Sequence, residues 1–143
     1  MSVSIFNRKA KFDYEFIDKY TAGICLVGSE VKAIRDSRVS MVDSFCFFIE
    51  NELWIKNAII TPGLNSFQHE PARDRKLLLK RKELKKLKGA LDPGLTIIPI
   101  RIFTSERNVI KVEIALCKGK KNYDKRQTIK ERDIEREIRG SIR

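Results

Sequence analysis

The sequence predicts a mainly β protein with a few short helices and a basic C-terminal tail. Six segments between residues 12 and 116 either alternate apolar and polar side chains or form short apolar runs, as strands do. Two other stretches change to helical spacing. The residues from 118 onward carry many charges and few large apolar side chains. Because this pattern suits a small closed or partly open barrel, we expect an OB-type antiparallel β-barrel with two or three short helices.

Two strands and a short helix are expected before residue 36. Residues 12–20 alternate apolar and charged side chains, and residues 23–27 form a shorter apolar run. Ser29 can cap a helix in which Glu30 occupies the first turn and Ile34 lies on the apolar face.

A β-hairpin is expected next. Residues 45–49 alternate, and residues 53–60 form a second strand-like run. Asn51 and Glu52 between them suit a turn, so the two runs should pair in antiparallel fashion. Pro62 and Gly63 end this unit.

The segment from 73 to 91 changes period, because Leu84, Leu87 and Leu91 recur at helical spacing with Leu77 seven residues before the first. This spacing predicts one basic helix.

A second hairpin is expected near the end of the barrel, where residues 98–102 and 110–116 alternate again. Pro99 cannot donate a ladder hydrogen bond, so it should lie at an edge or a bulge.

Positive charge is concentrated in two segments. Residues 73–88 hold nine Lys and Arg against two Asp and Glu, and residues 118–143 hold ten against five. These surpluses of seven and five together exceed the formal net charge of +11, so the rest of the chain is nearly neutral. Like charges three or four residues apart repel on a helix. A polyanionic partner therefore explains the segments better than a solvated helix face does.

The tail combines one aromatic residue with a thin apolar stripe. Tyr123 stands among lysines and an arginine, where stacking on an unpaired RNA base is a natural role. Ile134 and Ile138 are four residues apart, as on one face of a helix. Ion pairs along such a helix are too weak to hold it alone in water. We expect the tail to be disordered when free and helical on a partner.

The sequence contains no recognisable catalytic constellation. It lacks a glycine-rich phosphate loop, a nucleophile elbow and the paired Cys and His spacing of a zinc site. We expect no enzyme activity, no metal, no cofactor and no small-molecule substrate. Cys25, Cys46 and Cys117 should be buried reduced thiols, and His69, the only histidine, a surface or loop residue.

The apolar runs are far shorter than the roughly 20 residues that span a bilayer, and the N-terminus lacks the apolar core of a signal peptide. We expect a cytoplasmic monomer with no membrane partner.

Several segments resemble the SsrA-binding protein family, SmpB. The strongest match is Lys-Gly-Lys-Lys-Asn-Tyr-Asp-Lys-Arg at 118–126, and the others follow the family order over nearly the whole chain. These others are NRKAKFDY at 7–14, AGI at 22–24, GSEVK at 28–32, DS at 43–44 and EPARDRKLLL at 70–79.

The resemblance implies a protein that binds the tRNA-like domain of transfer-messenger RNA and delivers it to stalled ribosomes for trans-translation, with small-subunit rRNA as its second partner. It implies that residues 1–118 form the RNA-binding barrel and that residues 119–143 enter the vacant mRNA channel as a helix. The RNA-gripping candidates carried over by motif are Asn7, Arg8, Lys9, Lys32, Arg75, Lys76 and Leu78. The decoding-centre candidates are Lys118, Lys120, Lys121, Tyr123, Asp124, Lys125 and Arg126, with Ile134 and Ile138 on the tail helix.

Two departures from the family pattern matter. Thr21 stands where the family commonly has Glu, and Tyr123 stands where it often has His. Both Tyr and His can stack on a base, so that role survives. The alternative interpretation is a generic OB-fold RNA-binding or ribosome-assembly protein, and an RNA-processing enzyme is disfavoured by the missing catalytic cluster.

Overall fold

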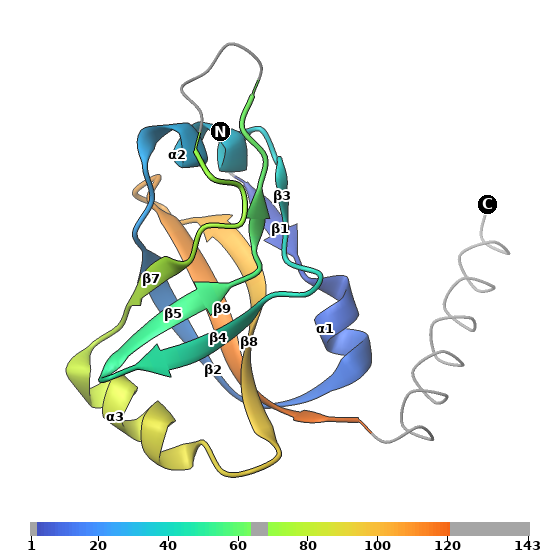
Figure 1. Cartoon of the computed structure of the whole chain (residues 1–143), viewed down its shortest axis with the longest axis vertical. Helices are drawn as coiled ribbons and strands as arrows, with labels where there is room; N and C mark the ends of the chain where they lie inside the picture. Colours follow the sequence, from blue (N-terminus) through green and yellow to red (C-terminus); the bar gives the residue numbers. More distant parts are fainter. Residues whose placement is uncertain (1–2, 64–68, 121–143) are drawn as a thin grey trace, which may run out of the picture.

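A closed ring of antiparallel strands forms the body of the molecule (Figure 1). The computed structural model describes residues 3–63 and 69–120. Its elements are β1 (Ser4–Phe6), α1 (Arg8–Asp13), β2 (Tyr14–Ile24), α2 (Gly28–Arg35), β3 (Val39–Ser40), β4 (Phe45–Ile49), β5 (Glu52–Lys56), β6 (Ile59–Ile60), β7 (Arg75–Leu78), α3 (Arg81–Ala90), β8 (Leu95–Thr104) and β9 (Ile110–Gly119).

The ring closes because β9 pairs on both of its edges. The main sheet runs in the order β1-β8-β4-β5-β7-β2-β9, and β9 also pairs with β8. Closure leaves the ring without the exposed edges that make open sheets prone to aggregation. β3 and β6 form a small separate pair. The prediction of a mainly β, OB-type antiparallel barrel with short helices is confirmed.

The core follows from the alternation of the strands. Ala22, Val112 and Ile102 lie opposite one another on β2, β9 and β8, and all three are buried. Their neighbours along each strand face outward, as the period of two requires. The predicted irregularity at Pro99 is confirmed, since the β8–β9 register shifts between Pro99 and Arg101. Such a bulge accommodates a residue that cannot donate to the ladder.

The N-terminal third differs from expectation in two ways. The expected strand over 12–20 starts too early, because Arg8–Asp13 forms helix α1. The expected break between residues 20 and 23 is wrong, because β2 runs without interruption from Tyr14 to Ile24. The first part of β2 alternates half-buried and exposed residues, and the exposed ones include charged side chains. The last residues, from Ala22 onward, are all buried or half-buried, so the single strand looked like two in the sequence.

Helix α2 begins two residues earlier than Ser29 would allow as a cap. The helix spans Gly28–Arg35, and the residue before it is Val27. The Val27 N–H donates to the Glu30 carboxylate at 2.9 Å, so Glu30 satisfies this amide from within the first turn. The turn between β4 and β5 is also earlier than expected, by one residue, at Glu50 and Asn51, and Glu50 has a φ of 57°.

The basic segment at 73–88 is not one helix. Residues Arg75–Leu78 form β7, between β5 and β2, and only Arg81–Ala90 form α3. Leu77 therefore faces the core from a strand, whereas Leu87 does so from the helix. Helices α2 and α3 lie at opposite ends of the barrel, and α1 lies at its side (Figure 1).

Candidate nucleic-acid interface

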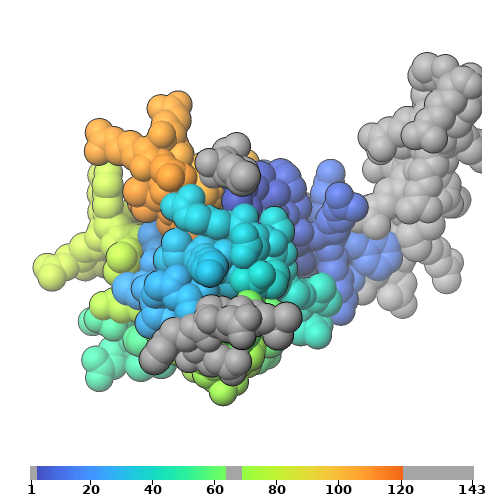
Figure 2. Space-filling view, turned by 90° about the horizontal axis from the view of Figure 1, so that it is seen from above, coloured from blue at the N-terminus to red at the C-terminus, as the bar shows by residue number. Residues whose placement is uncertain are grey.

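The residues expected to contact RNA fall into two separate groups. The first lies on α2 and β7, and the second lies on α1 and at the end of β9. Figure 1 shows β7 and α1 on different sides of the barrel. Seen from above, the yellow-green segment after residue 73 and the dark blue α1 again lie on opposite sides, with α2 between them (Figure 2).

The α2/β7 group is held together by an enclosed ion pair. Arg75 on β7 donates from Nε to Glu30 Oε2 on α2, and both side chains are fully buried. The Arg75 Nη1 and Nη2 groups donate to the carbonyls of Ala58 and Pro71 at 2.9 and 3.1 Å. Arg73 adds a second guanidinium to the other oxygen of Glu30. The buried charges are therefore paired and hydrogen-bonded, as their burial requires.

The ionisation of this cluster follows from these contacts. Burial alone would raise the pKa of the Glu30 carboxyl, but the hydrogen bonds from Arg73, the Val27 amide and Arg75 outweigh it, so the pKa lies below its ordinary value. Burial lowers the pKa of the Arg75 guanidinium, and the charge of Glu30 opposes this. The pair is thus a fixed charged link between α2 and β7.

The exposed fraction of Arg75, a predicted RNA contact, is 0%, so its guanidinium is used within the protein. Its contact with RNA stays a prediction. Its role in this structure is to position its neighbours: Lys76 follows it on β7, and Lys32 lies two residues beyond Glu30 on α2. Sequence reasoning missed Glu30 as part of the network. The sequence did hold a clue to the burial of Glu30. It lies one helical turn before Ala33 and Ile34, on the apolar face of α2.

Lys32, Lys76 and Leu78 remain on the surface. Lys32 is exposed, and Lys76 is partly exposed and paired with Glu52 at 3.0 Å. Leu78 is 50% exposed, which is notable for a large apolar side chain on a strand. It lies opposite Gly23 in the β2–β7 pair, and a Cβ on Gly23 would be 3.3 Å from the Leu78 Cβ. The glycine thus makes this close strand contact possible.

A row of outward-facing residues continues this surface across the barrel. Thr21 lies opposite Glu113 on β9, and Glu113 lies opposite Arg101 on β8. The Glu113 carboxylate is 3.5 Å from Arg101, whose guanidinium lies 4.1 Å from the centre of the Phe103 ring. Thr21 has no carboxylate where the family commonly has Glu, but the adjacent strand β9 presents the Glu113 carboxylate opposite it. Sequence reasoning missed Glu113, because strand register cannot be read from a single strand.

The α1 group surrounds the point at which the chain leaves the barrel. Asn7 caps α1: its Oδ1 accepts from the Ala10 amide at 3.3 Å, and its Nδ2 donates to the carbonyls of Met41 and Pro99 at 3.0 and 2.9 Å. Asn7 is only 7% exposed and uses its whole amide internally. Its amide therefore fixes the start of α1, and the RNA contact of Asn7 stays a prediction.

Arg8 and Lys9 are exposed on α1, and Lys9 lies 3.3 Å from Asp43. Lys118 is exposed near the end of β9. The Lys120 backbone N–H donates to the Asp13 carbonyl at 2.9 Å, and its Nζ donates to the Lys11 carbonyl at 3.1 Å. The beginning of the tail is thereby attached to α1. The remaining predicted tail residues lie outside the described residues; they are Lys121, Tyr123, Asp124, Lys125, Arg126, Ile134 and Ile138.

The described residues contain no group of three or more His, Cys, Asp or Glu that could hold a metal ion.

His69 is a partly buried loop residue whose Nε2 donates to the Ile60 carbonyl at 2.7 Å and whose Nδ1 accepts from the Ser29 hydroxyl at 2.7 Å. Burial raises the pKa of the Cys117 thiol to about 12, and raises that of Cys46 further. Cys25 is exposed, so the expectation of three buried thiols is wrong for it.

In the part of the chain that the structure describes, no helix is long and apolar enough to cross a membrane.

Comparison with known proteins identifies the family. The model of the family described as SmpB protein matches residues 4–143. The chain belongs to the SmpB family. An SsrA-binding protein of Phocaeicola vulgatus is 50% identical over 139 residues, which cover 95% of this chain and 93% of that protein. One of Cytophaga hutchinsonii is 54% identical, with coverage of 96% and 92%.

A solved SmpB structure has the same fold. It aligns with a TM-score of 0.71 at 38% identity, and the match covers 88% of this chain and 94% of the other. That structure is described by the words "tmRNA-SmpB: a journey to the center of the bacterial ribosome". The agreement extends the family assignment from sequence to three-dimensional structure.

Proposed function

We propose that this chain binds the tRNA-like domain of transfer-messenger RNA and delivers it to stalled ribosomes for trans-translation. Membership of the SmpB family supports the proposal, as do relatives named SsrA-binding protein and a solved relative described with tmRNA and the bacterial ribosome. Such a protein acts in the cytoplasm, where ribosomes are, and it works by binding rather than by catalysis.

The observation that carries the proposal is the separation of the two basic groups. A protein that links two RNA partners needs two surfaces that can be occupied together. The α2/β7 surface offers Lys32, Lys76 and Leu78, and the α1 side offers Arg8 and Lys9 next to the start of the tail. We assign the first surface to the tRNA-like domain. Lys118, Lys120 and the tail beyond them are assigned to the small ribosomal subunit.

This assignment divides the chain into a barrel of residues 1–118 and a ribosome-binding tail of residues 119–143. The attachment of Lys120 to α1 supports a boundary close to this position. The tail would place Lys121, Tyr123, Asp124, Lys125 and Arg126 in the decoding centre. Ile134 and Ile138 would lie on a helix in the mRNA channel.

A competition mobility shift tests the proposal. The full chain is bound to the isolated tRNA-like domain, and a normal tRNA is added as competitor. A clear preference for the tRNA-like domain that persists as salt is raised is expected, because contacts beyond phosphate carry specificity. Equal affinity for both RNAs at every salt concentration would favour a generic OB-fold RNA-binding protein instead.

A further inference from the structure

A groove lies between α3 and the β4–β5 turn, next to the end of β7. Its volume is about 570 Å³. Ligand sites for small organic molecules typically occupy about 300–1,000 Å³, so one nucleotide would fit. The groove is lined by Asn51, Glu52, Leu79, Arg81, Leu84, Lys85 and Lys88.

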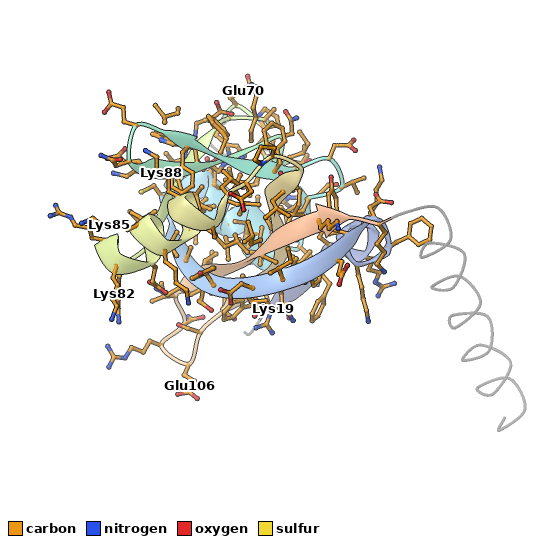
Figure 3. The ribbon with its side chains drawn as sticks, turned by 90° about the horizontal axis from the view of Figure 1, so that it is seen from below. Lys19, Glu70, Lys82, Lys85, Lys88 and Glu106 are labelled. Atoms are coloured by element: carbon orange, nitrogen blue, oxygen red, sulfur yellow. The ribbon has the colours of Figure 1, made fainter. Side chains whose placement is uncertain are left out.

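Cationic side chains form one wall of this groove. Arg81 and Lys85 are one helical turn apart on α3 and are exposed. Within residues 3–63 and 69–120, neither side chain has a hydrogen-bonding or ion-pairing partner, whereas Lys86 on another face of α3 lies 3.9 Å from Asp18. In the view from below, Lys82 and Lys85 project from α3 in different directions (Figure 3). Two cations one turn apart can hold one phosphate between them.

The remaining lining supplies apolar and hydrogen-bonding surface. Leu79 and Leu84 are half-buried and pack against the core, which fixes their positions. Lys88 donates from Nζ to the Glu50 carbonyl at 2.9 Å and to Asn51 Oδ1 at 3.1 Å, so it ties the turn to α3. Among the described residues none accepts from the Asn51 amide nitrogen, which can therefore donate to a ligand.

Glu52 is the one carboxylate in the lining, and its repulsion of a bound anion is weakened by an ion pair. Glu52 Oε1 lies 3.0 Å from Lys76 Nζ, so its charge is paired outside the groove. Glu83, the acidic residue of α3, accepts from the Lys80 amide at 3.1 Å at the start of the helix. The groove is thus cationic on one side, apolar between Leu79 and Leu84, and polar at Asn51.

We propose that this groove binds one unpaired nucleotide of an RNA strand. Its phosphate contacts Arg81 and Lys85, its base lies on Leu79 and Leu84, and the Asn51 amide donates to the base edge. An unpaired nucleotide uses all three kinds of surface, whereas a duplex offers phosphates but keeps its bases stacked inside. The inference rests on the proposed RNA-binding function and adds a third binding surface to it.

The α3 helix provides a matched control. Arg81→Gln with Lys85→Gln removes two cations from the groove, and Lys82→Gln with Lys86→Gln removes two from other faces of the same helix. Gln is a good helix former, and all four side chains are exposed, so both variants should melt at the wild-type temperature. The net charge change is identical in the two variants.

Binding of the full chain to a short fluorescein-labelled single-stranded RNA is measured by anisotropy across a salt series. The groove variant should bind at least tenfold more weakly than the control variant, because it removes both charged hydrogen bonds to the phosphate. For single-stranded RNA, its salt slope should fall by roughly 0.7 for each phosphate that the variant no longer neutralises. Equal reductions in affinity in the two variants, or no reduction in either, would overturn the proposal.

A displacement experiment tests the placement of the base. Adenosine 5′-monophosphate should displace the labelled RNA from the wild-type chain at a lower concentration than ribose 5-phosphate does. Equal displacement would overturn the contact with Leu79 and Leu84. Failure of the chain to prefer the tRNA-like domain over tRNA would instead count against the proposed function, so the two failures are distinguishable.

Discussion

Arg75 and Glu30 form an ion pair between β7 and α2 in which both side chains are 0% exposed. The pair joins an element of the barrel wall to the helix at one end, and each partner also bonds to backbone. Removing Glu30 leaves the Arg75 charge buried without its carboxylate, whereas removing Arg75 leaves Glu30 paired with Arg73 alone. Because Lys76 and Lys32 lie beside these two residues, the pair links stability to the geometry of the α2/β7 surface.

The single variant Glu30→Met should lower the free energy of unfolding by about 3–5 kcal/mol, because it leaves the buried Arg75 guanidinium without its carboxylate. Arg75→Met should cost less, because Arg73 still pairs with Glu30. The double variant Glu30→Met with Arg75→Met should be more stable than Glu30→Met alone, since no fully buried charge remains. Urea denaturation followed by circular dichroism measures all three. Additive losses of stability in the double variant would show that the two residues are not coupled.

The same pair predicts a pH dependence. The pKa of Glu30 is lower in the folded state than its ordinary value of 4.5. Its stabilisation is therefore fully present above the ordinary pKa and is lost as the pH falls through the lower folded pKa. Below about pH 5, the free energy of unfolding of the wild type should fall more steeply than that of the double Met variant. Parallel curves would mean that Glu30 does not titrate differently on folding.

Two glycine variants should change stability in opposite directions. Gly23→Ala places a Cβ 3.3 Å from the Leu78 Cβ, a tight contact that Leu78 must relieve by shifting a few tenths of an ångström, and we expect a loss of about 1 kcal/mol. Gly89→Ala meets nothing within 4 Å and lies within α3, where Ala is favoured by up to about 1 kcal/mol. Thermal melting should show a lower Tm for the first variant and a higher Tm for the second. The same sign for both would contradict the difference in packing.

The barrel was predictable because its strands keep the two-residue period and its hairpins are local. The division of residues 73–91 into a strand and a helix could not be predicted. Leu77 lies seven residues before Leu84, which suits a helix, but it suits an apolar position of a strand equally well. Pairing of β7 with β5 and β2 decides the question, and these contacts are distant in sequence. Tertiary pairing thus overrode a local pattern.

The candidate site was only partly predictable. Motif residues mark a candidate region, but a motif does not say which of its members face solvent. Asn7 and Arg75 belong to the matching segments and yet are enclosed by carbonyls from distant parts of the chain. The pairing of Glu113 with Arg101 opposite Thr21 depends on register across three strands, which no local pattern contains.

Leu78→Ala should weaken binding of the tRNA-like domain while leaving stability nearly unchanged, because the side chain is 50% exposed. Removal of its apolar surface from the RNA interface is expected to cost roughly 1 kcal/mol, or about fivefold in affinity. Ile17→Ala is the matched control, since Ile17 is 54% exposed on β2 and outside the α2/β7 surface. Mobility shifts and melting curves measure both variants. An equal loss of affinity in the control would show that Leu78 has no special place in the interface.

Truncation after Lys120 should separate the two proposed activities. Lys120 stays in the truncated chain, so its bonds to Asp13 and Lys11 on α1 are kept and the barrel should melt as the full chain does. Binding of the tRNA-like domain should persist, because the α2/β7 surface is intact. Tagging of incomplete polypeptides on stalled ribosomes should be lost, because the tail can no longer reach the small subunit. Loss of RNA binding on truncation would contradict this division between barrel and tail.

In the full chain, Tyr123→Ala should impair tagging far more than Tyr123→His does, since both Tyr and His can stack on a base. Equal defects in the two Tyr123 variants would contradict stacking.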